Sequence, residues 1–280
     1  MLIFDYYTKK WYHNPSLSSY VKKEYKHTLL VDSHWYSTTK ILNNNEPIFY
    51  MHALLGLRHS FWYNPITQVV NRVPNIETIL TKYDDVEAVA QYNNTIYFSY
   101  QTSYFHYLRY DCTTSICHPM KPMNNTRAYA ASVAFRDQLF VFGGTRDYDS
   151  LLSTCECYNF ISDSWTSLPD MPEAKSTMNA IILDSNTIAI LGGITNAHDG
   201  GDLNNDVFQY NVDTNTWIVA DWKLPYCTCS DAGSVYMLSE FQELVIANYH
   251  EGTHIFCLVS KKWRQVPNCC MKECYDINFS

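Results

Sequence analysis

The feature that most constrains the fold is a repeated pair, an aromatic residue followed seven positions later by tryptophan. The complete pairs are Phe4 with Trp11, Tyr158 with Trp165, Tyr210 with Trp217 and Phe256 with Trp263, and the partial ones are Tyr63 with Val70 and Tyr110 with Cys117. From Tyr63 onward the aromatic residues are separated by 47, 48, 52 and 46 residues. Units of ~40–50 residues are typical of propellers with four-stranded blades.

Each unit has the pattern of four short strands. In the unit 127–168, an alternating apolar segment, a tight turn and an apolar run lead to Gly143 and Gly144, and the Tyr and Trp segments follow. Such short apolar segments bounded by turn residues predict β-strands. The next unit has Gly192 and Gly193 at the same place. Glycine suits the end of a strand because it adopts positive φ without steric cost.

Composition agrees with a strand-rich core and limits the partners. The chain is 46% hydrophobic, 15% aromatic and only 17% charged, which argues against disorder and favours packed strands. The net charge is −8 and no basic run occurs. Because nucleic acid and anionic lipid bind through cationic side chains, we predict neither as a partner.

The expected compartment is the cytoplasm. No apolar run approaches the ~18 residues needed to cross a bilayer, and the first residues lack the pattern of a secretory signal. Ten cysteines would allow disulfides, but without such a signal we expect reduced thiols. The cluster Cys269, Cys270 and Cys274 is a candidate redox-sensitive group.

The order double glycine, tyrosine, tryptophan and Leu-Pro-x-Met-Pro resembles the kelch repeat. The chain is most similar to the kelch domain of BTB–kelch (kelch-like) substrate adaptors, over essentially its whole length. The structural motif residues are Gly143, Gly144, Tyr158, Trp165, Gly192, Gly193, Tyr210, Trp217, Phe256 and Trp263. The double glycine is replaced by His52-Ala53, Tyr100-Gln101 and Asn248-Tyr249 in three other units. Contacts that use those glycines in the family are therefore not carried over.

We predict an all-β, kelch-type β-propeller, a single domain over 1–280 with five complete four-stranded blades and one composite or incomplete blade, six in all. The predicted blades are 1–13 with 268–280, 27–75, 84–122, 127–174, 175–225 and 226–267. The first unit has only its third and fourth strands, and the tail 273–279 is expected to add one innermost strand. The upstream BTB and cullin-docking regions that the resemblance implies are not encoded in this chain.

The resemblance implies a protein–protein interaction module without enzymatic activity or cofactor. The expected function is substrate recognition for a cullin-type E3 ubiquitin ligase adaptor, with a protein or peptide ligand as partner. The alternative is an actin-associated or cytoskeletal kelch scaffold. A metal-dependent oxidase built on a propeller is the third and least favoured reading.

The ligand is expected at the loops between second and third strands and at the connections between blades. In a four-stranded antiparallel blade both emerge on the same side, and loops on a rigid scaffold commonly carry recognition. Mixed aromatic and charged side chains suit a protein partner. The candidate partner-binding residues are Arg146, Asp147, Tyr148, Asp149, Asn196, His198, Asp199, Asp202, Asn204, Tyr249, His250 and Glu251.

Three patterns could indicate metal chemistry. Residues 250–254 match the HExxH string of zinc proteases, but the string lies between two predicted strands, whereas that chemistry needs a helix. The aspartates of 199–206 fit no defined calcium loop. The Cys-x-Cys pairs at 155–157 and 227–229 would need ligands from distant blades. We therefore predict no metal site and no catalytic residue.

Overall fold

The structure is a computed structural model that describes most of the chain from residue 84 onward and only strands before it. The described ranges are 2–5, 10–13, 35–37, 48–54, 57–63, 70–72, 84–101, 105–146, 150–196, 202–227, 234–238, 241–248 and 252–266. The strands in these ranges pair with one another in antiparallel sheets. No helix in the described part has the length and hydropathy needed to cross a membrane.

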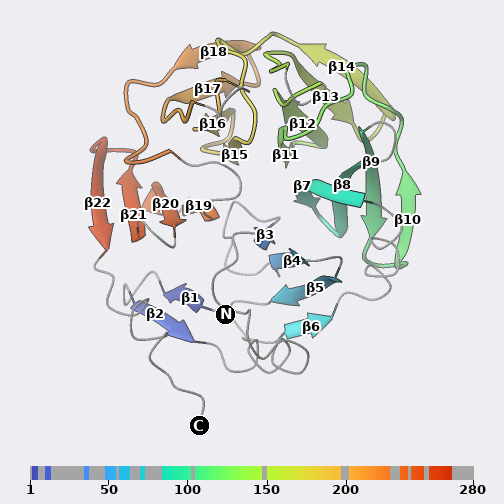
Figure 1. Ribbon diagram of the computed structural model, residues 1–280, viewed down its shortest axis with the longest axis horizontal. Coiled ribbons are helices and arrows are strands. Elements are labelled where there is room, and N and C mark those ends of the chain that lie inside the picture. The colour runs from blue at the N-terminus through green and yellow to red at the C-terminus, as the bar shows by residue number, and fades with distance from the viewer. Residues whose placement is uncertain are drawn as a thin grey trace.

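The strands form one two-stranded and five four-stranded sheets, arranged as the blades of a ring (Figure 1). Blade 1 is β1 (Leu2–Asp5) and β2 (Lys10–His13), blade 2 is β3 (Trp35–Ser37), β4 (Ile48–Leu54), β5 (Leu57–Tyr63) and β6 (Val70–Arg72), and blade 3 is β7 (Asp84–Tyr92), β8 (Thr95–Gln101), β9 (Phe105–Asp111) and β10 (Ile116–Pro119). Blade 4 is β11 (Ala131–Phe135), β12 (Gln138–Phe142), β13 (Cys155–Asn159) and β14 (Ser164–Leu168), and blade 5 is β15 (Asn179–Ile182), β16 (Thr187–Leu191), β17 (Val207–Asn211) and β18 (Thr216–Val219). Blade 6 is β19 (Ser234–Leu238), β20 (Glu243–Asn248), β21 (Gly252–Cys257) and β22 (Lys262–Val266). The first strand of each four-stranded blade lies innermost.

The seven-residue spacing is the signature of one hairpin in every blade. Each aromatic residue lies directly across from the residue seven positions later, as in Tyr158 opposite Trp165 and Phe4 opposite Trp11. The partial pairs keep this register, since Tyr63 lies opposite Val70. Directly opposed side chains on one face of a sheet are close enough to pack, and the Tyr158 and Trp165 ring centroids are 5.1 Å apart.

The motif tryptophans of blades 4, 5 and 6 also join their blade to the preceding one. The indole Nε1 of Trp165 donates to the carbonyl oxygen of Lys121 at 2.7 Å, and that of Trp217 donates to Pro169 at 2.9 Å. Trp263 makes the same bond to Lys223 at 2.8 Å. In each case the acceptor is a carbonyl that follows the outer strand of the neighbouring blade.

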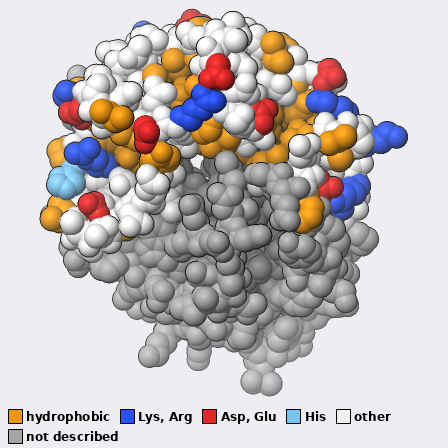
Figure 2. Space-filling model, turned by 180° about the vertical axis from the view of Figure 1, so that it is seen from behind, with side chains coloured by type: hydrophobic (Ala, Val, Ile, Leu, Met, Phe, Trp, Pro, Cys, Tyr) orange, Lys and Arg blue, Asp and Glu red, His pale blue; other side chains and the backbone are white. Residues whose placement is uncertain are grey.

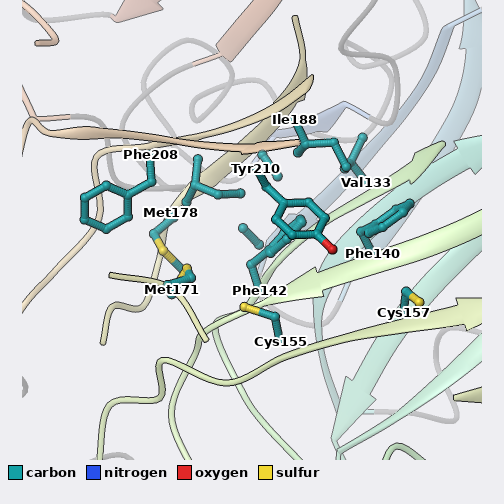
Figure 3. Close-up of a cluster of buried hydrophobic side chains, with 13 residues drawn as sticks. Val133, Phe140, Phe142, Cys155, Cys157, Met171, Met178, Ile188, Phe208 and Tyr210 are labelled. Carbon is teal, nitrogen blue, oxygen red and sulfur yellow. The ribbon is translucent and has the colours of Figure 1, made fainter. Parts of the chain in front are cut away.

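The core lies between neighbouring blades (Figure 3). Between blades 4 and 5 it combines aromatic, aliphatic and sulfur-containing side chains, namely Ala131, Val133, Phe140, Phe142, Cys155, Cys157, Met171, Met178, Ala180, Ile188, Ile190, Phe208 and Tyr210. Phe142 contacts Tyr210 edge to face, with centroids 6.0 Å apart. The middle strands β12 and β16 are buried on both faces, which explains their continuous apolar sequences.

The structure confirms the kelch-type propeller and the four-stranded pattern, and it adjusts several boundaries. From the alternating apolar sequence, the inner strand of blade 4 is expected to begin at residue 128. It begins at Ala131, because Ala128 forms an isolated bridge with Thr145. The loop between the second and third strands of blade 2 is expected at 51–57, but much of this range is strand, since β4 continues to Leu54. The expected inner strand at 273–279 lies outside the described residues.

Candidate functional site

The loop that follows β12 and the connection that follows β14 emerge at the same end of blade 4, as expected for antiparallel neighbours. Backbone hydrogen bonds join them directly: Met171 N donates to Ser153 O at 2.9 Å, and Lys175 N donates to Leu152 O at 3.2 Å. We call this side of the molecule the loop face, defined in the described residues by 143–146, 150–154, 169–178, 192–196 and 202–206. It is a rigid, internally bonded surface.

Four of the twelve predicted binding residues lie in described positions, all on the loop face. Arg146 and Asp202 are exposed. Asn196 and Asn204 are half-buried, and Asn196 Nδ2 donates to Asp202 Oδ2 at 3.4 Å. The other eight, Asp147, Tyr148, Asp149, His198, Asp199, Tyr249, His250 and Glu251, lie outside the described residues.

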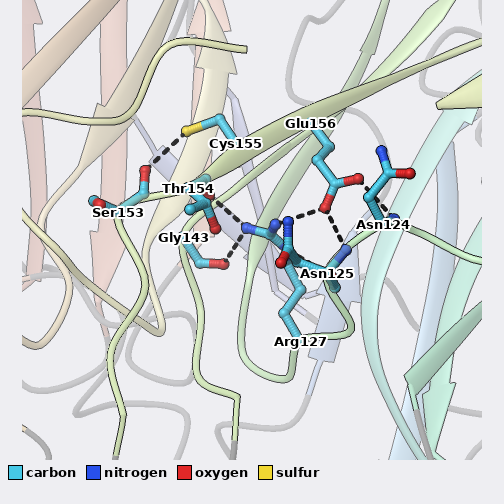
Figure 4. A network of polar contacts seen from close by, with 8 residues as sticks. All are labelled: Asn124, Asn125, Arg127, Gly143, Ser153, Thr154, Cys155 and Glu156. Carbon is cyan, nitrogen blue, oxygen red and sulfur yellow. Dashed lines mark hydrogen bonds and ion pairs between the residues drawn. The ribbon is translucent and has the colours of Figure 1, made fainter. Parts of the chain in front are cut away.

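Beneath the loop face of blade 4 lies a buried ion pair between Arg127 and Glu156 (Figure 4). Arg127 Nη2 lies 2.8 Å from Glu156 Oε1, and both side chains are 0% exposed. The guanidinium also donates to the carbonyl oxygens of Gly143 and Thr154. Glu156 accepts from the backbone N–H groups of Asn124 and Asn125 at 2.8 and 2.9 Å. The network therefore holds the double-glycine turn, the start of β13 and the connection from blade 3.

Blade 5 has a different arrangement at the same place. Lys175 stands four residues before β15, as Arg127 stands four residues before β11. Phe208 stands two residues before Tyr210, where Glu156 stands two residues before Tyr158. The Lys175 Nζ lies 4.0 Å from the centroid of the Phe208 ring, a cation–π contact in place of the ion pair.

The described surface mixes apolar and charged groups. Figure 2 shows apolar patches interrupted by basic and acidic side chains over the described blades. Leu203 on the loop face is 63% exposed, and Tyr129, in the connection before β11, is 38% exposed. The Tyr129 carbonyl accepts from Thr177 N at 2.8 Å, which joins the entrances of β11 and β15. This combination of rigid backbone and exposed aromatic, aliphatic and charged groups suits protein contact.

The described residues contain no group of three or more His, Cys, Asp or Glu side chains placed to hold a metal ion. Within the HExxH string, Gly252 to His254 lie in β21, and the His254 ring packs against Tyr226 with centroids 5.2 Å apart. The sequence predicts that the string lies between two strands, whereas its last three residues belong to β21. Cys155 and Cys157 share one core cluster between blades 4 and 5.

The described cysteines are free thiols in two different settings. Burial raises the pKa of Cys155 to about 12, and it raises the pKa of Cys117 to about 11. Cys257 lies instead at a hairpin turn, where the Ser260 side chain and then the Ser260 N–H, which donates to Sγ at 3.4 Å, lower its pKa. The thiol takes the place of the turn carboxamides of Asn159 and Asn211, which accept the same kind of backbone bond.

We expect Cys257 to be alkylated at least about tenfold faster than Cys117 or Cys155 in the folded protein at pH 8, because the thiolate is the reacting form. Its rate should level off at a lower pH than that of an ordinary thiol, since a lowered pKa means that the thiolate forms earlier as pH rises. Timed iodoacetamide labelling with peptide mass spectrometry measures each rate, and labelling after denaturation is the control. Equal rates for Cys257 and Cys155 before denaturation would contradict this reading of the turn.

Sequence reasoning missed Arg127, Glu156 and Lys175. The signal was present in the repeat alignment, because a cation precedes the inner strand at the same position in both intact units. The sequence also shows that the residue two positions before the motif tyrosine is Glu156 in one unit and Phe208 in the other. The roles of Arg127, Glu156 and Lys175 could not be predicted from the sequence, since they depend on contacts across the blade.

Comparison with known proteins agrees with the geometry. Residues 126–172 match the family described as the kelch motif. An F-box/kelch-repeat protein of Arabidopsis thaliana is 26% identical over 113 residues, 40% of this chain and 27% of that protein. Kelch repeat and BTB domain-containing protein 2 of Cowpox virus is 29% identical over 112 residues, 35% of this chain and 20% of that protein.

Alpha-scruin of Limulus polyphemus is 30% identical over 98 residues, 34% of this chain and 11% of that protein. The matches thus span between 11% and 27% of the length of these relatives. A solved structure titled "Structure of YjhT" superposes with a TM-score of 0.54 at 15% identity, covering 67% of this chain and 66% of that one, and shows the fold alone. The chain has a kelch-repeat β-propeller fold and resembles the kelch domains of BTB–kelch proteins.

Proposed function

We propose that this kelch-repeat β-propeller is a protein-recognition module that binds a protein or peptide partner on its loop face. The observation that carries the proposal is the coupling of the described loops of blades 4 and 5 into one bonded surface. Lys175 O accepts from Gly144 N at 2.8 Å, and Thr177 N donates to Tyr129 O. A partner that contacts both blades would meet a preorganised surface, which lowers the entropic cost of binding.

The chemistry of this surface favours a partner that offers both apolar and polar groups. Leu203 supplies exposed apolar area beside Asp202, and Arg146 supplies a cation on the loop of blade 4. Interfaces of this kind gain most of their energy from a few central side chains. For this reason we propose a short folded or extended protein segment as the ligand rather than a small molecule.

The more specific role that we propose is substrate recognition for a cullin-type ubiquitin ligase adaptor. Its support is the similarity to proteins whose names include BTB or F-box domains together with kelch repeats. In BTB–kelch adaptors the BTB and helical regions dock the cullin, and the propeller selects the target. We place this protein in the cytoplasm, in keeping with the free thiols of the described cysteines.

The test compares two double variants with the same chemical changes at opposite ends of the blades. Asp202→Lys with Leu203→Ser alters the loop face, and Asp184→Lys with Ile161→Ser alters the opposite ends of blades 5 and 4. All four side chains are exposed, so each change should leave stability within about 0.5 kcal/mol. Crosslinking and affinity purification from cells should recover partners with the wild type and the control variant.

Loss of the same partners only in the loop-face variant supports recognition by this surface. Partners that bind the loop-face variant as tightly as the wild type would refute it. For the ligase role, ubiquitination of the captured partner should fall when the loop face is altered. A partner whose ubiquitination and turnover do not depend on this surface would overturn that role while leaving the binding function intact.

A further inference from the structure

Lys175 is buried between two loops of the loop face, and its main chain and side chain bind different ones. The main chain bonds to blade 4, where Gly144 N donates to Lys175 O and Lys175 N donates to Leu152 O. The side chain points into blade 5, where Nζ donates to Asn204 Oδ1 at 2.9 Å. One residue thus joins the loop after β12 to the loop after β16.

Among the described residues, no fully buried carboxylate contacts the ammonium, and the half-buried Asp206 acts on it through its charge. The ammonium contacts Asn204 Oδ1, the face of Phe208 and the carboxylate of Glu173, whose oxygen lies 3.6 Å away and which is half exposed. Burial lowers the pKa of Lys175, because the charged form loses hydration. Among the described residues, the hydrogen bond to Asn204 at 2.9 Å is shorter than the contact with Glu173 at 3.6 Å.

Of blades 4 and 5, whose loops are described, only blade 5 has this link to a loop side chain. Asn204 N donates to Gly193 O at 2.9 Å, and the matching bond in blade 4 runs from Leu152 N to Gly144 O at 2.8 Å. The residue that corresponds to Asn204 is thus Leu152, which has no side-chain acceptor. Arg127 accordingly bonds to Glu156 and to carbonyl oxygens at strand ends.

We propose that Lys175 is the positioning residue of the loop face, which couples the loops of blades 4 and 5 and sets the shape that they present together. The consequence for recognition rests on the function proposed above, but the coupling itself can be measured without a partner. The Phe at 208 is what creates the coupling, because it removes the carboxylate that would otherwise hold the cation within the blade.

The first test is Lys175→Met, which keeps the length and burial of the side chain but removes its charge. Hydrogen exchange should become about tenfold faster at the amides of Thr195 and Asn204, which close the blade 5 loop. The amides of Gly144 and Leu152 should also exchange faster, by a smaller factor, while those within β12 and β16 stay unchanged. The control is Lys223→Met, which removes an exposed cation that pairs with Asp206 next to the same loop, and it should change these rates less than about twofold.

The second test is Phe208→Glu, which restores at this position the carboxylate found in blade 4. The ammonium should turn to the new carboxylate and release Asn204, so that loop exchange rises as in Lys175→Met. Because Phe208 also packs in the core between blades 4 and 5, the melting temperature should fall, and exchange is measured well below it. If loop protection is unchanged in both variants, Lys175 does not position the loop. Faster exchange throughout β15–β17 in Lys175→Met would mean that Lys175 stabilises the whole blade and does not position the loop. Unchanged exchange of the Gly144 and Leu152 amides in that variant would refute the coupling between the two loops.

The same variants separate this inference from the proposed function. In a pull-down with a partner that the wild type captures, Lys175→Met should weaken binding although no surface residue is changed. Retained binding with a loosened loop would overturn the positioning role in recognition but leave the loop face as the binding surface. Loss of binding in Lys175→Met, but not in the Asp202 and Leu203 variant, would instead overturn the proposed function.

Discussion

Replacing Arg127 with Met is expected to lower the free energy of unfolding by about 3–5 kcal/mol. The substitution removes the partner of Glu156, whose side chain is 0% exposed, and leaves a carboxylate buried with only the Asn124 and Asn125 N–H groups as donors. It also removes the donors to Gly143 O and Thr154 O at the double-glycine turn. Urea denaturation, followed by tryptophan fluorescence, measures the loss.

The companion variant is Arg127→Met with Glu156→Met. Replacing both charges by apolar side chains of similar size removes the uncompensated charge, so the double variant should regain a large part of the lost stability. A double variant no more stable than Arg127→Met would show that the charge of Glu156 is not the source of the loss. Lys121→Met, which breaks an exposed ion pair with Asp163, should cost at most about 1 kcal/mol and serves as the control.

Replacing Gly144 with Ala is expected to cost about 2–4 kcal/mol. Gly144 has a φ of +97°, a region that residues with a Cβ rarely adopt. A Cβ there would lie 2.3 Å from the Ala128 carbonyl oxygen and 3.2 Å from the Ala130 Cα, and backbone cannot move aside as a flexible side chain does. Ser167→Ala, on the exposed face of β14, is the control and should change stability by less than about 0.5 kcal/mol.

The measurement for Gly144→Ala is the denaturation midpoint together with the exchange rate of the Thr145 and Leu152 amides, which bond across this turn. A variant with wild-type midpoint and exchange would contradict the positive-φ requirement. The expected loss of stability also means that a blade without the double glycine cannot form the same turn. Where it is replaced, as by Tyr100 and Gln101 in blade 3, the backbone must follow another path.

Most of the described fold was predictable because the repeat is a local property. The spacing of seven residues follows from one hairpin, and each aromatic residue lies opposite its partner, as with Tyr210 and Trp217. The spacing of the units follows from the length of four strands. Strand ends were less predictable, since Ala128 has a strand-like sequence but is held outside β11 by its bridge to Thr145.

The candidate site was predictable only in outline. The topology placed loops and connections on one side, and the hydrogen bond from Lys175 N to Leu152 O joins a loop to a connection there. Asn204 was predicted as a surface contact, but the structure turns its Oδ1 toward the buried Lys175. Side-chain direction within a loop depends on neighbours from another blade, which a single repeat does not specify.

The sequence by itself therefore determined the repeat, its hairpin register and the class of the fold, because these depend on short-range spacing and strand length. Only the tertiary structure decided which cation meets which partner. Arg127 and Lys175 occupy equivalent positions, yet one pairs with a carboxylate and the other with a loop amide and an aromatic face. That difference arises because burial makes each charge depend on whatever polar group the neighbouring strands and loops bring within hydrogen-bonding distance.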